Sequence, residues 1–258
     1  MAHLGLAGPS VTAQETKGRE IVVVGTVHSA TNNFTEHTLI TILKQVKPDL
    51  ILLELDPSFF DSSFVLAEKY RTISMENKAV LPYAQMTGVK LRPYDIEGRN
   101  KFYQDNDYFG REVRLNQQIA RMSEAGQLPS EAKQQFEALK ALSAVRDSCG
   151  AESPAVMNSP HCDLAVERKQ HYAFKGIAKI IELTPPLSEF KLFWGLADDF
   201  WTRRNEAMVT NIIRFSKELK AMKAVVLTGF EHRYYLRKRL TEQAPKEGFV
   251  VKEYWEVK

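Results

Sequence analysis

The chain has 258 residues, enough to bury the core of one α/β domain, and its 44% hydrophobic and 26% charged residues exclude a disordered or fibrous protein. Its 35 lysines and arginines barely outnumber its 32 aspartates and glutamates and are mixed along the chain, so we expect no nucleic-acid partner. No apolar run approaches the roughly 18 to 20 residues of a membrane span.

The N-terminal segment and the two cysteines give the first predictions. Residues 1–18 lack the charged and apolar regions of a signal peptide, so we expect a loose arm followed by a single domain over residues 19–258. Cys149 and Cys162 lie near a segment, 148–160, whose composition predicts a loop, and their spacing with the neighbouring histidine and aspartate matches no zinc site. Because two cysteines make no disulfide framework, we predict a reducing, cytoplasmic compartment.

The first predicted strand is a run of β-branched residues, Ile21–Val24, of the kind that is buried on both faces of a sheet. Gly25 marks its end, and His28 follows three residues later. Ligands collect at the carboxyl ends of parallel strands, so this position favours a chemical role for His28. The alternative is a histidine that caps a helix or has only a structural hydrogen bond.

A second strand follows after one helix. Asn33 and Glu36 have the spacing of a capping pair, and Pro48 ends the helix that they open. Residues 49–55 then predict a buried strand, and a strand–helix–strand unit of this kind makes its two strands parallel. Glu54 should therefore lie at the same edge of the sheet as the first histidine. A carboxylate in so apolar a run is expected to be paired or functional, a salt bridge to a helix being the alternative.

Two helices and a third strand come next. Residues 57–70 predict a helical region whose aromatic residues cover the sheet, and a second helix from about 78 to 87 ends at Gly88. Residues 89–94 predict a third strand, and the proline within it indicates an edge or a strand terminus. Asp95 at its end is a further candidate at the rim, or else a turn or capping residue.

A helical part fills the middle of the chain. Residues from about 107 to 147 predict a helical hairpin, broken at 126–129, that stands on the sheet as a lid or an oligomer contact. Another helix is predicted over 163–183, and two prolines separate it from a long helix over about 187–220. The aromatic residues of the long helix are interpreted as core.

Arg204 and Asn205 are the candidates within that long helix. They stand just before an apolar face, where the guanidinium could point toward the rim, although a surface salt bridge is the ordinary alternative. Residues 224–228 then predict a fourth parallel strand, followed by Gly229 and, three residues later, His232. This repeats the glycine and histidine spacing of the first strand.

The C-terminal part completes the predicted domain. A basic helix runs to about Gln243, and its cluster of cations, which begins at Arg233, is interpreted as a solvated face. An alternating strand over 249–257 closes the chain. The elements together predict an α/β fold with a single, largely parallel central sheet flanked by helices, plus the helical-hairpin insertion.

Four short motifs occur along the chain in this order: Gly25-Thr26-Val27-His28, Leu53-Glu54-Leu55-Asp56, Arg204-Asn205 before Met208, and Gly229-Phe230-Glu231-His232. Together they resemble the TraB/TIKI superfamily, which also takes in erythromycin-esterase-like and haem-binding ChaN-like proteins. The resemblance covers the first hundred residues and roughly 200–240. It implies an α/β domain with both histidines at one rim, and often a hydrolase: a metal-dependent protease in the TIKI branch, or a histidine general base without a tightly held metal in the esterase branch.

The leading hypothesis is hydrolysis of an amide or ester bond, in a small-molecule or peptide substrate, by an activated water. In one version His28, Glu54 and His232 hold a divalent transition metal such as Mn²⁺, Co²⁺ or Zn²⁺, and Arg204 stabilises the oxyanion. In the metal-free version His28 or Glu54 takes the proton from water. A serine nucleophile is disfavoured because the chain has no G-x-S-x-G motif.

The competing hypothesis is a binding protein without catalytic activity. It would take haem, another metal or a sequestered peptide, with a histidine and Tyr94 or Tyr103 as possible iron ligands.

Overall fold

The computed structural model describes residues 18–257 and has an α/β fold built on five parallel strands. The expected N-terminal arm therefore lies almost wholly outside the described residues. The sheet has the order β3-β2-β4-β1-β5, which confirms the predicted fold class and the edge position of the proline-containing strand. The strands are β1 (Arg19–Thr26), β2 (Leu50–Leu53), β3 (Lys90–Pro93), β4 (Lys223–Gly229) and β5 (Phe249–Lys252).

Helices cover both faces of the sheet and extend beyond it. They are α1 (Glu36–Val46), α2 (Met75–Thr87), α3 (Arg99–Asp105), α4 (Tyr108–Glu124), α5 (Ser130–Ala151), α6 (Pro154–Met157), α7 (Pro160–His171), α8 (Ile177–Leu183), α9 (Lys191–Glu218) and α10 (Phe230–Glu247). A π-helical turn, Tyr172–Gly176, joins α7 to α8. Among the described residues, no helix combines the length and the apolarity of a membrane span.

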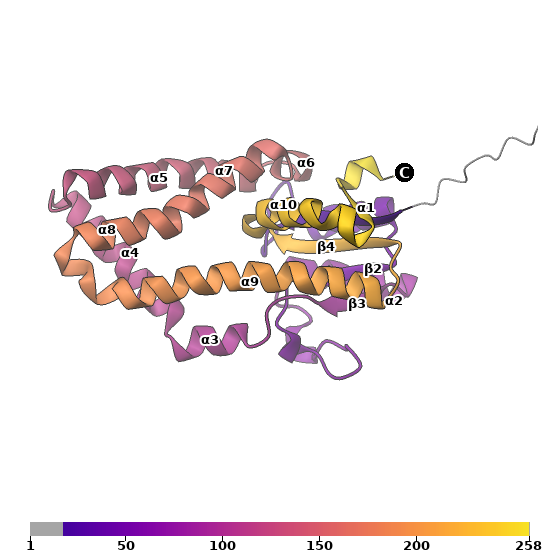
Figure 1. The fold of residues 1–258 in the computed structure, drawn as a ribbon. Helices are drawn as coiled ribbons and strands as arrows, with labels where there is room; N and C mark the ends of the chain where they lie inside the picture. Colours follow the sequence, from indigo (N-terminus) through magenta and orange to yellow (C-terminus); the bar gives the residue numbers. More distant parts are fainter. Residues whose placement is uncertain (1–17, 258) are drawn as a thin grey trace, which may run out of the picture.

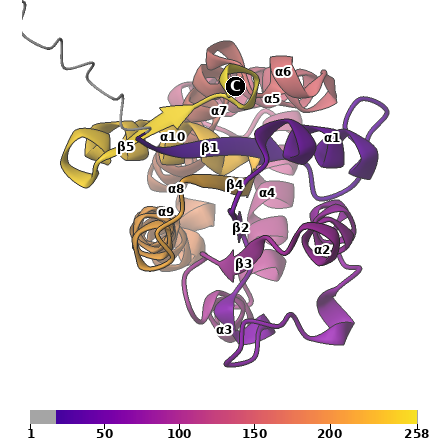
Figure 2. The ribbon, with the colours of Figure 1, turned by 90° about the vertical axis from the view of Figure 1, so that its right-hand side faces the viewer.

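Alternate residues of each strand enter different cores because successive side chains point to opposite faces of a sheet. Val22 and Val24 pack with α1 and α2, whereas Ile21 and Val23 pack with α9 and α10. Figure 2 shows α1 and α2 on one side of the sheet and α9 on the other. The uninterrupted apolar run of β1 is thus explained by burial on both faces.

The strand order places a topological switch point around β4. The chain leaves β1 toward β2 on one side, but leaves β4 toward β5 on the other, and β4 lies between β1 and β2. In open α/β sheets a crevice forms where neighbouring connections diverge in this way, outside the carboxyl ends of the strands. The topology therefore favours a site at the ends of β1, β2 and β4.

The helical part does not stand on the sheet as predicted but lies beyond the carboxyl ends of its strands (Figure 1). It has an apolar core of its own, to which α4 contributes Leu115 and Ile119 and α8 contributes Ile180. Helix α9 joins the two parts: Phe193 belongs to the helical core and Ile212 to the sheet core. The break of the hairpin lies where it was predicted, with α4 and α5 separated near Gly126, but α5 continues past the predicted end at 147 to Ala151.

Three local predictions are wrong for identifiable reasons. Residues 57–70 hold only two short 3-10 helices, because Asp61 accepts hydrogen bonds from two nearby backbone N–H groups and so competes with a helix. Residues 148–160 are largely helical, since Ser153 and Ser159 each cap a helix that begins with proline. The cap of α1 is Thr35, not the predicted asparagine.

The basic cluster of α10 is not simply a solvated face, because Arg233 is 0% exposed. Its guanidinium pairs with Asp163 and with Glu253, and it also donates to the carbonyl of Val23 in β1. An added Cβ at Gly25 would come within 2.9 Å of the Arg233 side chain and 3.0 Å of Phe230. Gly25 is therefore needed for the close approach of α10 to β1.

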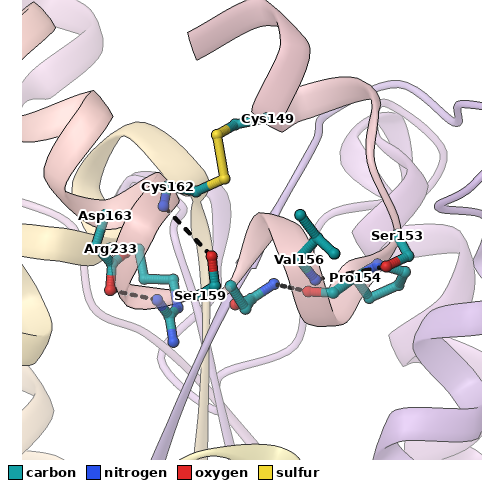
Figure 3. Close-up of a disulfide and its surroundings, with 9 residues drawn as sticks. Cys149, Ser153, Pro154, Val156, Ser159, Cys162, Asp163 and Arg233 are labelled. Atoms are coloured by element: carbon teal, nitrogen blue, oxygen red, sulfur yellow. Dashed lines mark hydrogen bonds and ion pairs between the residues drawn. A yellow bond between two sulfur atoms is a disulfide. The ribbon is translucent and has the colours of Figure 1, made fainter. Parts of the chain in front are cut away.

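The two cysteines form a disulfide, which corrects the prediction drawn from their number. Figure 3 shows the bond between Cys149, near the end of α5, and Cys162, in the first turn of α7. Between them lies Asn158, whose side chain accepts the Gly25 N–H at 2.6 Å and donates to the Gly25 carbonyl at 3.1 Å. The bond thus encloses the residue that holds the end of β1, and it removes the basis for predicting a reducing compartment.

Candidate active site at the carboxyl edge of the sheet

A cavity of about 490 Å³ lies at the switch point, within the size range of small-molecule sites. Its lining brings together three of the six predicted site residues, His28, Glu54 and Arg204. The other three, Asp95, Asn205 and His232, do not line this cavity and lie behind Arg204. The remaining lining residues are Leu53, Leu55, Phe59, Ile73, Ser74, Glu76, Asn77, Arg99, Asn100, Tyr103, Phe109, Leu227 and Gly229.

Glu54 is anchored from three directions. One carboxylate oxygen accepts the Gly229 N–H at 2.7 Å and the Thr228 hydroxyl at 2.8 Å, and the other accepts an N–H of Arg204 at 2.6 Å. Glu54 follows Leu53, which faces α1 and α2, so alternation turns the carboxylate toward α9 and α10. The buried acid is thus both paired, as the ordinary reading of the sequence suggested, and part of the cavity wall.

Arg204 has acceptors for all five of its N–H groups. Its Nε and one Nη2 N–H donate to the two oxygens of Asp95, both at 2.8 Å, and the other Nη2 N–H donates to Glu54. Its Nη1 lies 3.1 Å from His232 Nε2 and 3.5 Å from the Tyr103 hydroxyl. Because no N–H is left over, the predicted role of Arg204 as an oxyanion donor does not fit, and the guanidinium instead fixes the two carboxylates.

His232 is enclosed rather than presented to the cavity. Its Nδ1 lies 2.8 Å from Asn205 Oδ1, and its ring stacks on Trp201 with centroids 4.3 Å apart. Since Nε2 faces the donor Arg204, Nε2 is the acceptor, and the protonated Nδ1 donates a hydrogen bond to Asn205 Oδ1. Burial lowers the pKa of His232 to about 4, which agrees with a neutral ring at neutral pH.

His28 has the opposite surroundings. Its side chain is 68% exposed, and its Nδ1 lies 3.3 Å from Glu76 Oε1, which also accepts the Thr26 hydroxyl at 2.6 Å. The hydrogen bond to Glu76 raises the pKa of His28 above its ordinary value, and burial opposes it only in part. Among the described residues, none hydrogen-bonds to His28 Nε2.

The free nitrogen of His28 and the carboxylate of Glu54 meet above Gly229. A Cβ built at Gly229 would lie 3.4 Å from His28 Nε2 and 3.6 Å from Glu54 Oε2. The absence of a side chain there leaves space that one small group, such as a water molecule, can share with both. Gly229, the glycine of the second motif, thus keeps the space between His28 and Glu54 open.

Both acidic groups that face the cavity are held in their ionised form. Burial alone would raise the pKa of Glu54, but its neighbours His232 and Arg204 together lower it to about 2. Burial would likewise raise the pKa of Glu76, but the hydrogen bonds from His28 and Thr26 and the attraction of His28 together lower it.

The predicted metal set of His28, Glu54 and His232 does not fit the arrangement. Both ring nitrogens of His232 are engaged, Nε2 with the Arg204 guanidinium and Nδ1 with Asn205, so this ring has no nitrogen left to bind a metal. Over the described residues there is no group of three or more His, Cys, Asp or Glu side chains arranged to hold a metal ion. Asp95 is fully buried and is committed to Arg204 and Arg99.

Sequence analysis gave no catalytic role to two residues of the cavity, Glu76 and Tyr103. Glu76 stands in the first turn of α2, where an acidic residue is the ordinary partner of the helix dipole, and only the fold directs it to His28. Tyr103 appeared only as a possible iron ligand, whereas its hydroxyl lies beside Arg204. The other tyrosine considered, Tyr94, is fully buried and donates to the Leu227 carbonyl at 3.0 Å, so it is closed to a ligand.

No protein-family model, curated protein or solved structure matches this chain.

Proposed function

We propose that this protein hydrolyses an ester or amide bond of a small-molecule or peptide substrate, with His28 as the general base that activates water. One observation carries this: His28 is bound through Nδ1 to Glu76, while its Nε2 has no hydrogen-bond partner among the residues that the structure describes and lies beside Glu54 above Gly229. A carboxylate on one imidazole nitrogen fixes the tautomer and leaves the other nitrogen basic.

In the proposed reaction a water molecule donates one hydrogen bond to His28 Nε2 and one to Glu54. As the water oxygen bonds to the carbonyl carbon, Nε2 takes its proton and Glu76 stabilises the imidazolium. The same proton then passes to the leaving alcohol or amine as its bond to carbon breaks. A positioned base of this kind contributes about 10² to 10⁴ in rate.

His28 is a better base than Glu54 because its pKa lies nearer neutrality. General-base catalysis is most effective when the pKa of the base is close to the working pH. Glu54, with a pKa of about 2, is too weakly basic to take the proton, so it orients the water.

Tyr103 replaces Arg204 as the oxyanion donor in this proposal. Burial raises the pKa of Tyr103, with Arg204 opposing the effect, so the phenol keeps its proton at neutral pH. Its oxygen faces Arg204 Nη1, which leaves the hydroxyl proton free to point into the cavity.

The resemblance to the TraB/TIKI superfamily supports the same reaction class. Of its branches, the esterase-like one, with a histidine base and no tightly held metal, is compatible with this donor set, whereas the metalloprotease branch is not. We therefore propose membership in the superfamily together with the metal-free mechanism.

The test is hydrolysis of a panel of p-nitrophenyl esters and peptide amides by the wild-type protein and by His28→Gln. We expect hydrolysis that EDTA does not reduce, and a loss of about 10² to 10⁴ in kcat/KM in the variant. His37→Gln is the matched control, because it removes an exposed histidine from α1. Equal rates for wild type and His28→Gln contradict the mechanism.

The same experiment with the wild-type protein and His28→Gln distinguishes a hydrolase from a binding protein. A binding module hydrolyses nothing in the panel, and a haem protein shows a visible absorption band that His28→Gln removes.

A further inference from the structure

We infer that the cavity selects substrates that carry an uncharged, apolar group next to the scissile carbonyl, and that Ile73 and Phe109 determine this specificity. The substrate specificity rests on the proposed function. The preference of the cavity for uncharged, apolar ligands does not, and it can be tested by binding alone.

The cavity has a polar floor and an apolar entrance. Two large apolar side chains in its lining are more than half exposed, Ile73 at 54% and Phe109 at 59%. Single exposed apolar residues are common on protein surfaces, but these two come from different segments and line one cavity. Phe59 and Leu55 extend the same apolar lining.

Each of the two residues lies close to a residue of the proposed mechanism, Ile73 to His28 and Phe109 to Tyr103. The Met75 N–H, two residues after Ile73, donates to the His28 carbonyl at 3.1 Å. The Phe109 ring lies 4.9 Å, between centroids, from the ring of Tyr103, whose hydroxyl faces Arg204. An apolar group that covers both side chains is therefore held close to the reacting atoms.

The charges of the site argue against an anionic ligand. Arg204 is shared between Glu54 and Asp95, and Arg99 donates to Asp95 at 2.6 Å. Glu76 adds a third carboxylate, so these five groups carry one more negative than positive charge while His28 is neutral. The two guanidiniums of the lining, Arg204 and Arg99, are both already paired with Asp95, so a further carboxylate or phosphate would enter a site of net negative charge and face Glu54 across the cavity.

The probes are neutral ketones that cannot be hydrolysed: 2-butanone, 2-hexanone and 2-octanone, with octanoate as the charged comparison. Their dissociation constants are measured by NMR titration of the full chain. Each buried methylene should tighten binding about three- to four-fold, and octanoate should bind more weakly than 2-octanone. In the double variant Ile73→Ala/Phe109→Ala this dependence on chain length should flatten.

Leu192→Ala is the control, because Leu192 is 83% exposed on α9 and lies outside the cavity lining. It should leave the chain-length dependence unchanged, and circular dichroism checks that both variants are folded. Affinity that does not depend on chain length, or octanoate that binds as tightly as 2-octanone, overturns the inference. If the ketones show the dependence but no ester or amide is cleaved, the apolar ligand class stands and the hydrolase proposal fails.

Discussion

The two histidines that follow a glycine turn at the carboxyl edge of the sheet have opposite surroundings. His232 lies under Trp201, with both ring nitrogens engaged and a pKa lowered by burial. His28 is largely exposed, holds one carboxylate and has a pKa raised by it. The same spacing after a parallel strand therefore produces a structural ring on one face of the sheet and a candidate base on the other.

The difference arises from what packs above each strand end. The end of β4 continues at once into α10, which places His232 against α9 and its arginine. After β1 the chain forms no helix until residue 36. The helix that contacts His28 is therefore α2, through the residues of its first turn. The side of the site next to α9 and α10, called the buried face below, therefore holds Glu54 in place, and the side next to α2, called the exposed face, leaves Nε2 of His28 open.

The largest effect is expected from removing the guanidinium on the buried face. Arg204→Met leaves Asp95 and Glu54 without their main cation, and breaking a buried ion pair in this way costs about 3 to 5 kcal/mol. Urea denaturation followed by circular dichroism measures the free energy of unfolding. Arg204→Lys should recover only part of the loss, because a lysine cannot bridge both carboxylates.

The adjacent arginine offers a matched control. Arg203 pairs with Asp199 one turn earlier on the surface of α9, and its side chain is 52% exposed. Arg203→Met should change the free energy of unfolding by less than about 0.5 kcal/mol. Similar losses for the two variants would show that Arg204 is not the centre of the buried network.

The second prediction concerns the stability of the buried face in acid. His232 has a pKa of about 4 in the folded protein and an ordinary value of 6.5 when unfolded. Between these pH values His232 is protonated in the unfolded chain but not in the folded protein. The free energy of unfolding therefore falls by roughly 3 kcal/mol as the pH drops from 6.5 toward 4. Urea denaturation at several pH values measures the slope.

His232→Gln removes this titration and should flatten the slope in that window. His37→Gln, at an exposed position of α1, should leave the slope as it is in the wild type. Identical slopes for all three proteins would mean that His232 takes up its proton at the same pH in the folded and unfolded states, and so would contradict a lowered pKa.

The smallest effect is expected on the exposed face, where Glu76→Gln weakens the support of His28. A base acts when deprotonated, so kcat/KM should rise with pH through the raised pKa of His28. Without the carboxylate, the pKa of His28 falls, and the acid limb of the profile moves to lower pH with a reduced plateau. Glu36→Gln, at a partly exposed acid in the first turn of α1, is the control. If the acid limb of the profile does not move in Glu76→Gln, Glu76 does not set the pKa of the catalytic base.

Residue patterns were sufficient for the parallel sheet and for most of the residues around its carboxyl edge. The apolar runs of β1, β2 and β4 are long enough to require burial on both faces, and parallel strands then bring their following residues together. His28 and Glu54 could be chosen in this way, whereas Arg204 lies within α9 and was chosen for its place before an apolar helix face.

Pattern failed where a side chain has two ordinary uses. Glu76 lies before the predicted start of its helix and received no role, and the two cysteines were too few to indicate a disulfide framework. Ser153 and Ser159 read as loop residues, although each caps a helix. In each case local spacing is compatible with both uses, and only a contact from a distant segment decides.

The sequence by itself determined which strands are buried and that polar groups follow them at one edge, because alternation and apolar content are local properties. Only the tertiary structure decided which of those groups is free to react. The packing of α9 and α10 uses up the hydrogen-bonding groups of Arg204 and His232, whereas the short contact with α2 leaves one nitrogen of His28 open. Burial and hydrogen-bond saturation are set by neighbours far away in the chain, and no local pattern encodes them.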